Sequence, residues 1–360
     1  MNQKRSIFGA LKWIMFNYVF LGILILIGLV IALAPDLLGD VIPRHGTVGK
    51  LLTSLNERKI EDSQHTVMTV PDYVRRVVAI GDSTADIMGA IGGDPYIVAT
   101  DGSPYSSSTQ VNGRVELTVD SIKSYEPDVV VAPDSTPPSL VSSLRAAGIP
   151  VFIYTKKDSF NDIVLATKTI GKIFKHEDPE REFIVSKRNV KKLVEPHEKD
   201  KKPVIALYNS SHGVYRSGIV RDMIEKVNGI DGAGNLVITQ NGKDPKIFSD
   251  VSWYRDHKTT VDMNQSMGTK ADLIRINPDV IFVPTRFIDK MPEYKQDVAA
   301  IMNDPDLQNV TAVEKGYVYP IHEMFVMSHS WKAFMAMEQM AKWLYGPSTY
   351  EGIVKYKSEP

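Results

Sequence analysis

The sequence contains no cysteine. This absence excludes disulfides, thiolate metal sites, a cysteine nucleophile and attachment of a lipid through cysteine. The chain also has little net charge: 42 basic and 43 acidic residues leave a formal charge of −1, with both signs mixed along the sequence. Such a balance gives no sign of nucleic-acid binding, and a length of 360 residues allows two compact domains.

The amino-terminal segment holds a long run without charge. Trp13–Ala34 is rich in Leu, Ile, Val and Phe, and about 20 such residues cross the hydrocarbon core as a helix. Lysine and arginine precede the run and aspartate follows it, so the positive-inside rule places the amino terminus in the cytoplasm. A cleaved signal peptide is the alternative, because Ala32–Ala34 has the small-x-small form. We expect an uncleaved single-pass anchor in the cell membrane, with the rest of the chain outside it.

Two similar strand patterns organise the rest of the chain. Pro127–Asp134 (PDVVVAPD) is a short apolar run framed by proline, and Pro278–Pro284 (PDVIFVP) repeats it in the second half. Such runs are typical of parallel strands that are covered on both faces. Strand and helix patterns alternate around each copy, which predicts an α/β fold of two lobes with parallel-rich sheets.

The sequence predicts five segments. They are a transmembrane anchor over 1–34, a tether over 35–71, an N-terminal α/β lobe over 72–176, a linking helix over 177–202 and a C-terminal α/β lobe over 203–360. The linking helix rests on Pro179–Glu195, which has a helical pattern, many charges and few apolar positions, and which Pro196 should end. Its place between the two repeats favours one rigid helix that bridges the lobes. An ordinary surface helix is the alternative.

Several blocks of the sequence resemble the substrate-binding proteins of ABC importers, in the class whose lobes are joined by one long helix (class III). The blocks are RVVAIGDSTADIMGAIGG (76–93), VDSIKSYEPDVVVAPD (119–134), LRAAGIPVFIY (144–154), KADLIRINPDVIFV (270–283) and LQNVTAVEKGYVYPI (307–321). The resemblance implies two Rossmann-like lobes with a cleft for a ferric siderophore, haem or a corrinoid such as cobalamin. It also implies delivery of that ligand to the permease and ATPase of an importer.

The cleft of an open α/β fold lies at the carboxyl ends of the strands. Loops at those positions carry hydroxyls, aromatic rings and arginines, which suit a bulky, partly anionic metal chelate. The predicted ligand-binding residues are Ser83, Thr84, Tyr105, Ser106, Asp134, His212, Tyr215, Arg216, Trp253, Tyr254, Arg286, His322 and Met324. His212, His257 and His322 are weaker candidates for an axial metal ligand. Because no close-spaced set of metal ligands exists, a chelate is favoured over a bare ion, and no resident cofactor is expected.

The resemblance also implies a surface that docks on the transporter. Relatives carry an acidic residue on each lobe, seven residues before the proline of the Pro-Asp strand, where it pairs with transporter arginines. In this chain the first position is Asp120. The second position is Ala271, which departs from the pattern, and Asp272 beside it is the candidate substitute.

Two other functions fit parts of the sequence. Gly-Asp-Ser after an early strand resembles the nucleophile block of the SGNH esterases, with Ser83 as the nucleophile, but the sole Asp-x-x-His is Asp62–His65, which precedes the serine. A membrane-tethered scaffold with a degenerate cleft would keep the fold and bind nothing. The aromatic and arginine content of the cleft loops argues against it. We therefore expect a receptor for a chelated metal that is not an enzyme.

Overall fold

The structure is a computed structural model. It describes Tyr18, Gly22 and residues 57–357, apart from 82, 103–112, 157–158, 177–180, 217, 235–267, 286–290, 327 and 348–353. Residues Lys59–Pro360 form one compact unit, and Met1–Arg58 are a separate unit. The anchor predicted over 13–34 lies outside the described residues except for Tyr18 and Gly22, which are helical. Among the described helices, none has the length and apolar character needed to span a bilayer.

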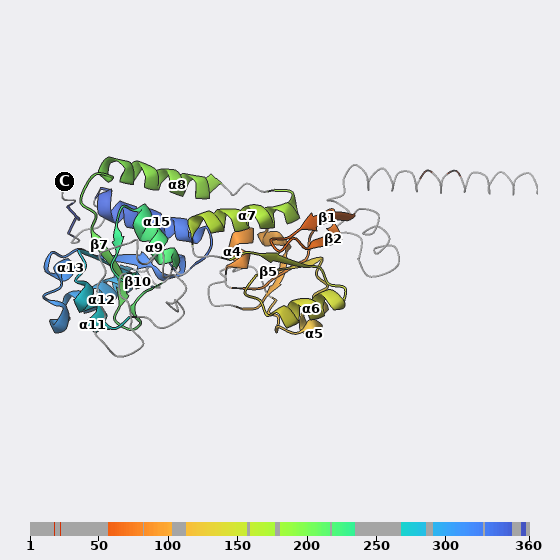
Figure 1. Ribbon diagram of the computed structural model, residues 1–360, viewed down its shortest axis with the longest axis horizontal. Helices are drawn as coiled ribbons and strands as arrows, with labels where there is room; N and C mark the ends of the chain where they lie inside the picture. The colour runs from red at the N-terminus through yellow and green to blue at the C-terminus, as the bar shows by residue number, and fades with distance from the viewer. Residues whose placement is uncertain are drawn as a thin grey trace, which may run out of the picture. The chain divides into compact units, whose positions relative to one another are not determined.

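The first lobe is built on a parallel sheet with the strand order β4-β3-β5-β6, of which β5 is labelled in Figure 1. The strands are β3 (Val77–Ala79), β4 (Ile97–Thr100), β5 (Val129–Pro133) and β6 (Val151–Tyr154). Every residue of β5 is buried, as the PDVVVAPD pattern predicts, and its alternate residues enter two apolar cores. Helices α4 (Thr84–Gly89) and α7 (Phe160–Phe174) contribute to one core, and α5 (Val119–Ser124) and α6 (Pro138–Ala146) to the other. The short η1 (Asp94–Tyr96) precedes β4.

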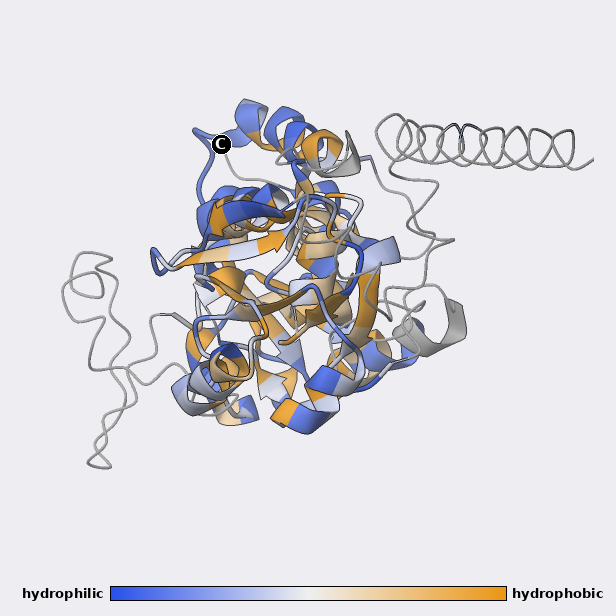
Figure 2. Ribbon diagram, turned by 90° about the vertical axis from the view of Figure 1, so that its right-hand side faces the viewer, coloured by the Kyte–Doolittle hydropathy of each residue, from blue (hydrophilic) through white to orange (hydrophobic). Residues whose placement is uncertain are grey.

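The second lobe repeats this plan. Its parallel strands are β7 (Val204–Asn209), β9 (Ile230–Asp231), β10 (Val280–Thr285) and β11 (Val318–His322), and the short β8 (Gly213–Val214) is antiparallel to β7. Strand β10 lies between β7 and β11 and is fully buried, as β5 is in the first sheet. Figure 2 shows the hydrophobic character of the interior strands and the mixed character of the helices around them.

Two groups of helices cover the second sheet. One core includes residues of α9 (Gly218–Lys226), α14 (Glu323–Val326) and α15 (Lys332–Tyr345). The other includes residues of α11 (Lys270–Ile276), α12 (Met291–Met302), η3 (Pro305–Leu307) and α13 (Thr311–Glu314). These layers confirm the predicted α/β fold with parallel-rich sheets.

The aspartate of each Pro-Asp pair ties its strand to a neighbour. The Asp128 carboxylate accepts hydrogen bonds from the backbone N–H groups of Arg75 and Arg76, at 2.8 and 3.0 Å, just before β3. In the second lobe the Asp279 carboxylate accepts a hydrogen bond from the N–H of Val204, at 2.8 Å, where β7 begins. Burying an N–H group without a hydrogen-bond partner costs free energy. Asp128 and Asp279 therefore stabilise the starts of β3 and β7, which are the strands that β5 and β10 pair with.

The sequence assigns residues 57–71 to the tether, but the structure places two strands there. Strands β1 (Glu57–Glu61) and β2 (Val67–Pro71) pair with each other, and Ile60 and Val70 enter the first core. Between them, the N–H of Ser63 donates to the carbonyl of Ile153 in β6, at 2.9 Å. Apolar contact and hydrogen bonding thus hold these residues on the first lobe.

The helix that contacts both lobes is α7, and not the predicted linking helix. In α7, Phe160 and Ile163 belong to the core of the second lobe, whereas Ile170 and Ile173 belong to that of the first. An α-helix of this length spans about 22 Å, which is enough to reach both cores. The predicted linker contains α8 (Arg181–Val194), which packs on α15 of the second lobe and is followed by η2 (Glu195–His197). The predicted limits of the lobes remain predictions.

Candidate ligand-binding site

The segments that follow β3 and β11 contact each other. Ser83 lies just after β3, and His329 lies shortly after β11 and α14. The backbone N–H of His329 donates a hydrogen bond to Oγ of Ser83, at 3.2 Å. Both segments leave the carboxyl ends of parallel strands, where open α/β sheets bind ligands. This contact therefore brings together the two edges that the sequence predicts to form the cleft.

A buried ion pair joins the lobes beside this contact. Nζ of Lys332, at the start of α15, lies 2.8 Å from Oδ1 of Asp86 in α4, and the two side chains are only 10% and 4% exposed. A cation in the first turn of a helix opposes the helix dipole, so the Asp86 carboxylate offsets an unfavourable position as well as a buried charge. Hydroxyls of Ser328 and Ser330 adjoin the pair. The sequence analysis missed both members, since neither follows a predicted strand directly.

Ser83 and Thr84 are predicted to contact the ligand, but both are fully buried. Oγ of Ser83 accepts the hydrogen bond from His329, and the Thr84 hydroxyl donates to the carbonyl of Ile80 and lies 3.0 Å from the Tyr154 hydroxyl. Ser83 is the N-cap of α4, yet neither side chain caps the helix. Both hydroxyls are used inside the protein. This also argues against Ser83 as an esterase nucleophile, which must reach its substrate.

The loop after β5 offers polar groups at the first edge. The Asp134 carboxylate is exposed and accepts a hydrogen bond from the N–H of Lys156, at 3.2 Å. Oγ1 of Thr136 is buried, and no described group forms a hydrogen bond with it. Nearby, Gly81 turns the chain after β3 with φ of +96°, and a Cβ there would lie 3.0 Å from the Pro133 ring. The turn thus requires glycine and brings the two loops together.

The second edge holds a buried carboxylate that the sequence analysis did not single out. Glu323 directly follows β11, and its Oε1 accepts a hydrogen bond from the Tyr215 hydroxyl, at 3.1 Å. Tyr215 is itself buried, so its ring is not the open flat surface that the sequence predicts. The predicted ligands His322 and Met324 flank Glu323 and are half-buried. The structure therefore brings three predicted residues to the carboxyl end of β11.

His212 and Arg216 lie on either side of β8 and differ in position. His212 is exposed in the turn after β7, at the carboxyl edge. Beyond β8 the chain runs back along β7, since the N–H of Tyr215 donates to the carbonyl of Leu207. Arg216 lies on this return. Burial raises the pKa of Asp231 to about 6, and the positive charge of Arg216 is among the groups that oppose this rise. Because the return is antiparallel to β7, the backbone of Arg216 lies farther from the carboxyl end of β7 than that of His212.

Several predicted residues lie outside the described residues. They are Tyr105, Ser106, Trp253, Tyr254, Arg286 and the weaker metal candidate His257. Within the described part of the chain, no group of three or more metal-binding side chains is placed to hold an ion. The part that these six residues outside the described ranges play in the site stays a prediction.

The two predicted docking residues have different surroundings. Asp120 is exposed in the first turn of α5. The N-cap of α5 is Thr118, whose side chain accepts a hydrogen bond from the N–H of Ser121. Asp272 is buried: its carboxylate completes a capping box with Thr269 and lies 2.7 Å from a guanidinium nitrogen of Arg275. Those partners already engage Asp272, which leaves Asp120 as the accessible acid of the two.

The comparisons agree with the fold. A family model described as periplasmic binding protein matches residues 77–245. The chain is 30% identical over 119 residues to the cobalamin-binding protein of Halobacterium salinarum, a match that covers 31% of this chain and 32% of the relative. The chain thus spans about a third of the length of the curated relatives it matches.

Two solved structures are similar in fold. The periplasmic heme-binding protein RhuT from Roseiflexus sp. RS-1 is 19% identical, with a TM-score of 0.51 over 74% of this chain and 97% of that one. A periplasmic binding protein from Veillonella parvula is 15% identical, with a TM-score of 0.56 over 81% of this chain and 99% of that one. Residues 77–245 thus match the model of the periplasmic binding protein family, and both solved structures share the fold, which confirms the resemblance drawn from the sequence.

Proposed function

We propose that the chain is the substrate-binding protein of an ABC importer and that it captures a chelated metal between its lobes. The observation that carries the proposal is the contact between Ser83 and His329, which sets the carboxyl edges of two parallel sheets side by side. The match to the periplasmic binding protein family supports a binding protein that breaks no bond. The chelate is an anionic iron complex such as a ferric siderophore, and the permease and ATPase of the importer receive it.

A haem or corrinoid ligand is the second candidate within the same function. It is supported by the relative named as a cobalamin-binding protein and by the similar fold named as a heme-binding protein. His322 and Met324, beside Glu323 at the end of β11, supply the kinds of side chain that ligate haem iron or cobalt. A siderophore needs no such ligand, because its iron is already enclosed. The two candidates therefore make different demands on His322.

We also propose that the chain is held at the cell membrane by Trp13–Ala34, with its amino terminus in the cytoplasm and its binding unit outside. Without cysteine the chain cannot be anchored by a thioether-linked lipid, so a helix would serve instead. Protease added to intact cells should then digest the unit over 59–360. A protected unit would contradict this orientation.

The ligand can be identified from thermal stability. We expect one compound among ferric siderophores, haem and cobalamin to raise the thermal midpoint of the purified full chain, whereas free metal ions leave it unchanged. A ligand at 100 times its dissociation constant stabilises the folded state by about 2.7 kcal/mol, which shifts the midpoint of a protein of this size by a few degrees. Arg286→Ala should weaken binding about tenfold or more, because a charge-assisted hydrogen bond to the anion is lost.

Arg221→Ala is the matched control, since Arg221 pairs with Glu225 on α9. It should leave the affinity unchanged. His322→Ala separates the two ligand classes: a loss of binding with a changed visible spectrum favours haem or a corrinoid, and full binding favours a siderophore. If no compound shifts the midpoint and the chain hydrolyses an ester until Ser83→Ala is introduced, the receptor function is wrong.

Docking on the importer is proposed to use Asp120. We expect Asp120→Lys to abolish ligand-stimulated ATP hydrolysis by the reconstituted importer, because a cation would face the transporter's arginines, while ligand affinity stays unchanged. Asp272→Asn should act through stability and not through docking, since that carboxylate is engaged in a helix cap. Normal stimulation by the Asp120→Lys protein would refute this contact.

A further inference from the structure

Helix α8 presents apolar and basic side chains on its outward face. Its inward face is settled by contacts with the second lobe, because Val190 and Val194 are buried in that core and the Asn189 amide donates a hydrogen bond to Oε1 of Glu338 in α15, at 2.9 Å. Helical spacing places the opposite residues together. We call them the α8 surface; they are Ile184, Val185, Arg188, Lys191 and Lys192, all exposed.

The cations of the α8 surface have no acidic partner among the described residues. In contrast, Lys342 is paired with Glu338, and Lys270 with Asp304 and Asp306. Arg188 and Lys192 are four residues apart, which places like charges next to each other and destabilises a helix. This arrangement of like charges does not stabilise a helix whose face contacts only water. The α8 surface is therefore complementary to a negatively charged partner.

The same surface exposes branched apolar side chains between its charges. Ile184 is 47% and Val185 38% exposed, and both lie on the turn before Arg188. Apolar side chains among arginine and lysine on one helix face are the pattern of helices that lie in the interface of an anionic bilayer. There the cations meet phosphates and the apolar groups enter the acyl boundary. An acidic protein surface would satisfy the charges but not the exposed isoleucine and valine.

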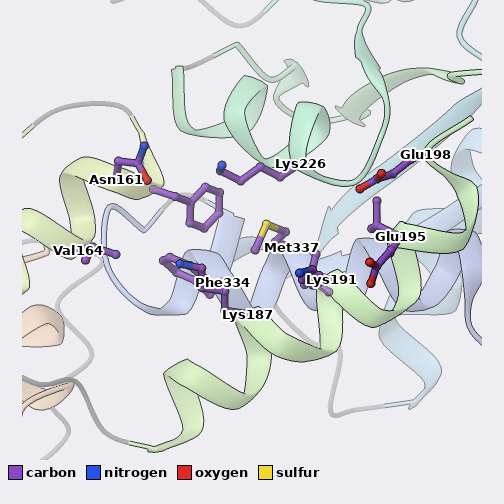
Figure 3. Close-up of a pocket in the computed structure, with 12 residues that line it drawn as sticks. Asn161, Val164, Lys187, Lys191, Glu195, Glu198, Lys226, Phe334 and Met337 are labelled. Atoms are coloured by element: carbon purple, nitrogen blue, oxygen red, sulfur yellow. The ribbon is translucent and has the colours of Figure 1, made fainter.

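The pattern continues onto α7 across a shallow groove. The groove has a volume of about 220 Å³ and is lined by Lys187 and Lys191 of α8 and by Val164 of α7 (Figure 3). Beside Val164, Leu165 is 59% exposed, and Lys168 lies one turn further along α7. The carboxylates of Glu195 and Glu198 line the end of the groove away from Asn161 (Figure 3). Basic and apolar groups thus extend over two adjoining helices.

We propose that the α8 surface binds an anionic phospholipid bilayer. Arg188, Lys191 and Lys192 contact the phosphates, and Ile184 and Val185 enter the interface. This contact holds the second lobe on the membrane while the chain is not docked on the importer, because α8 and the helix α5 that carries Asp120 lie on opposite sides of the binding unit (Figure 1). It does not depend on which chelate the chain captures.

The absence of cysteine allows a direct test on the full chain. In V185C, an environment-sensitive fluorophore reports the surroundings of the α8 surface. With vesicles of phosphatidylcholine and phosphatidylglycerol we expect a blue shift of its emission that high salt reverses, and with phosphatidylcholine alone no shift. Insertion of the amino-terminal segment is common to both vesicles and does not explain a difference between them. The same fluorophore on K315C, at an exposed site after α13, should not respond.

Charge removal provides the second arm. R188Q/K191Q/K192Q in the labelled chain should weaken the response about tenfold or more, because each basic residue near an anionic surface adds to the attraction. The matched control K59Q/K315Q/K355Q removes three other exposed lysines and should leave the response intact. Equal shifts with both vesicles, an unaffected R188Q/K191Q/K192Q protein, or a silent probe that responds instead to an acidic protein would each overturn the proposal.

Discussion

Replacing Asp86 by alanine should lower the free energy of unfolding by about 3–5 kcal/mol, because the substitution leaves the Lys332 ammonium buried without its counter-charge. The pair lies 2.8 Å apart with little exposure, so water cannot take the place of the carboxylate without opening the junction between the lobes. Lys332 also begins α15, where a cation alone opposes the helix dipole. Denaturant unfolding of the purified chain, followed by tryptophan fluorescence, measures the loss.

A double variant separates charge from packing. Asp86→Asn with Lys332→Met removes both charges, and it should cost much less than Asp86→Ala, because replacing a whole buried pair by neutral groups is often close to neutral. Glu225→Ala removes the partner of Arg221 in a half-exposed pair and should change stability by less than about 1 kcal/mol. If the single and the double variant lose the same amount, the pair stabilises the junction by packing and not by charge.

The strands at the centre of both sheets could be predicted because their burial is continuous. PDVVVAPD and PDVIFVP contain no charge between their flanking residues, and β5 and β10 are buried at every position. In contrast, β1 and β2 each bury one residue fully, Ile60 and Val70, and their other residues are polar or partly exposed. A strand with so little burial has almost no pattern, and only its contact with the first core reveals it.

The bridge between the lobes could not be placed from the sequence, because periodicity shows that a helix has an apolar face and not what that face contacts. Helix α7 has apolar residues at helical spacing, yet its two halves enter different cores. Helix α8 was predicted as the bridge from its position between the repeats. Its buried apolar residues, Val190 and Val194, enter one core only.

The candidate site was predictable at the level of loops and much less so at the level of side chains. The rule for carboxyl ends assigns the site to the turns after β3, β5 and β11, and that assignment stays a prediction. The rule could not show that the hydroxyls of Ser83 and Thr84 form hydrogen bonds with His329 and Tyr154, which lie on distant segments. The Asp86–Lys332 pair joins residues 246 positions apart, and no local pattern reports such a contact.

Phe334→Ala should produce a loss of similar size, about 3–5 kcal/mol, at the contact between α7 and α15. The rings of Phe334 and Phe160 meet edge to face with centroids 4.3 Å apart, and both side chains are almost fully buried. The N–H of Phe160 donates to the carboxylate of Asp222 in α9, at 2.7 Å, which fixes the start of α7 on the second lobe. Collapse into the cavity is therefore restricted, and the cost of truncation stays high.

The segments in which amide hydrogen exchange accelerates distinguish a contact that couples the lobes from an ordinary core contact. In Phe334→Ala, amide hydrogen exchange should accelerate along the whole of α7, including the half that contains Ile170 and Ile173 in the first core. Met340→Ala removes another buried side chain of α15 and should accelerate exchange in the second lobe alone. If both variants have the same pattern of exchange, α7 does not couple the lobes. If only Phe334→Ala reaches the first lobe, the contact with Phe160 is what transmits stability between the two cores, and the width of the cleft depends on it together with Asp86 and Lys332.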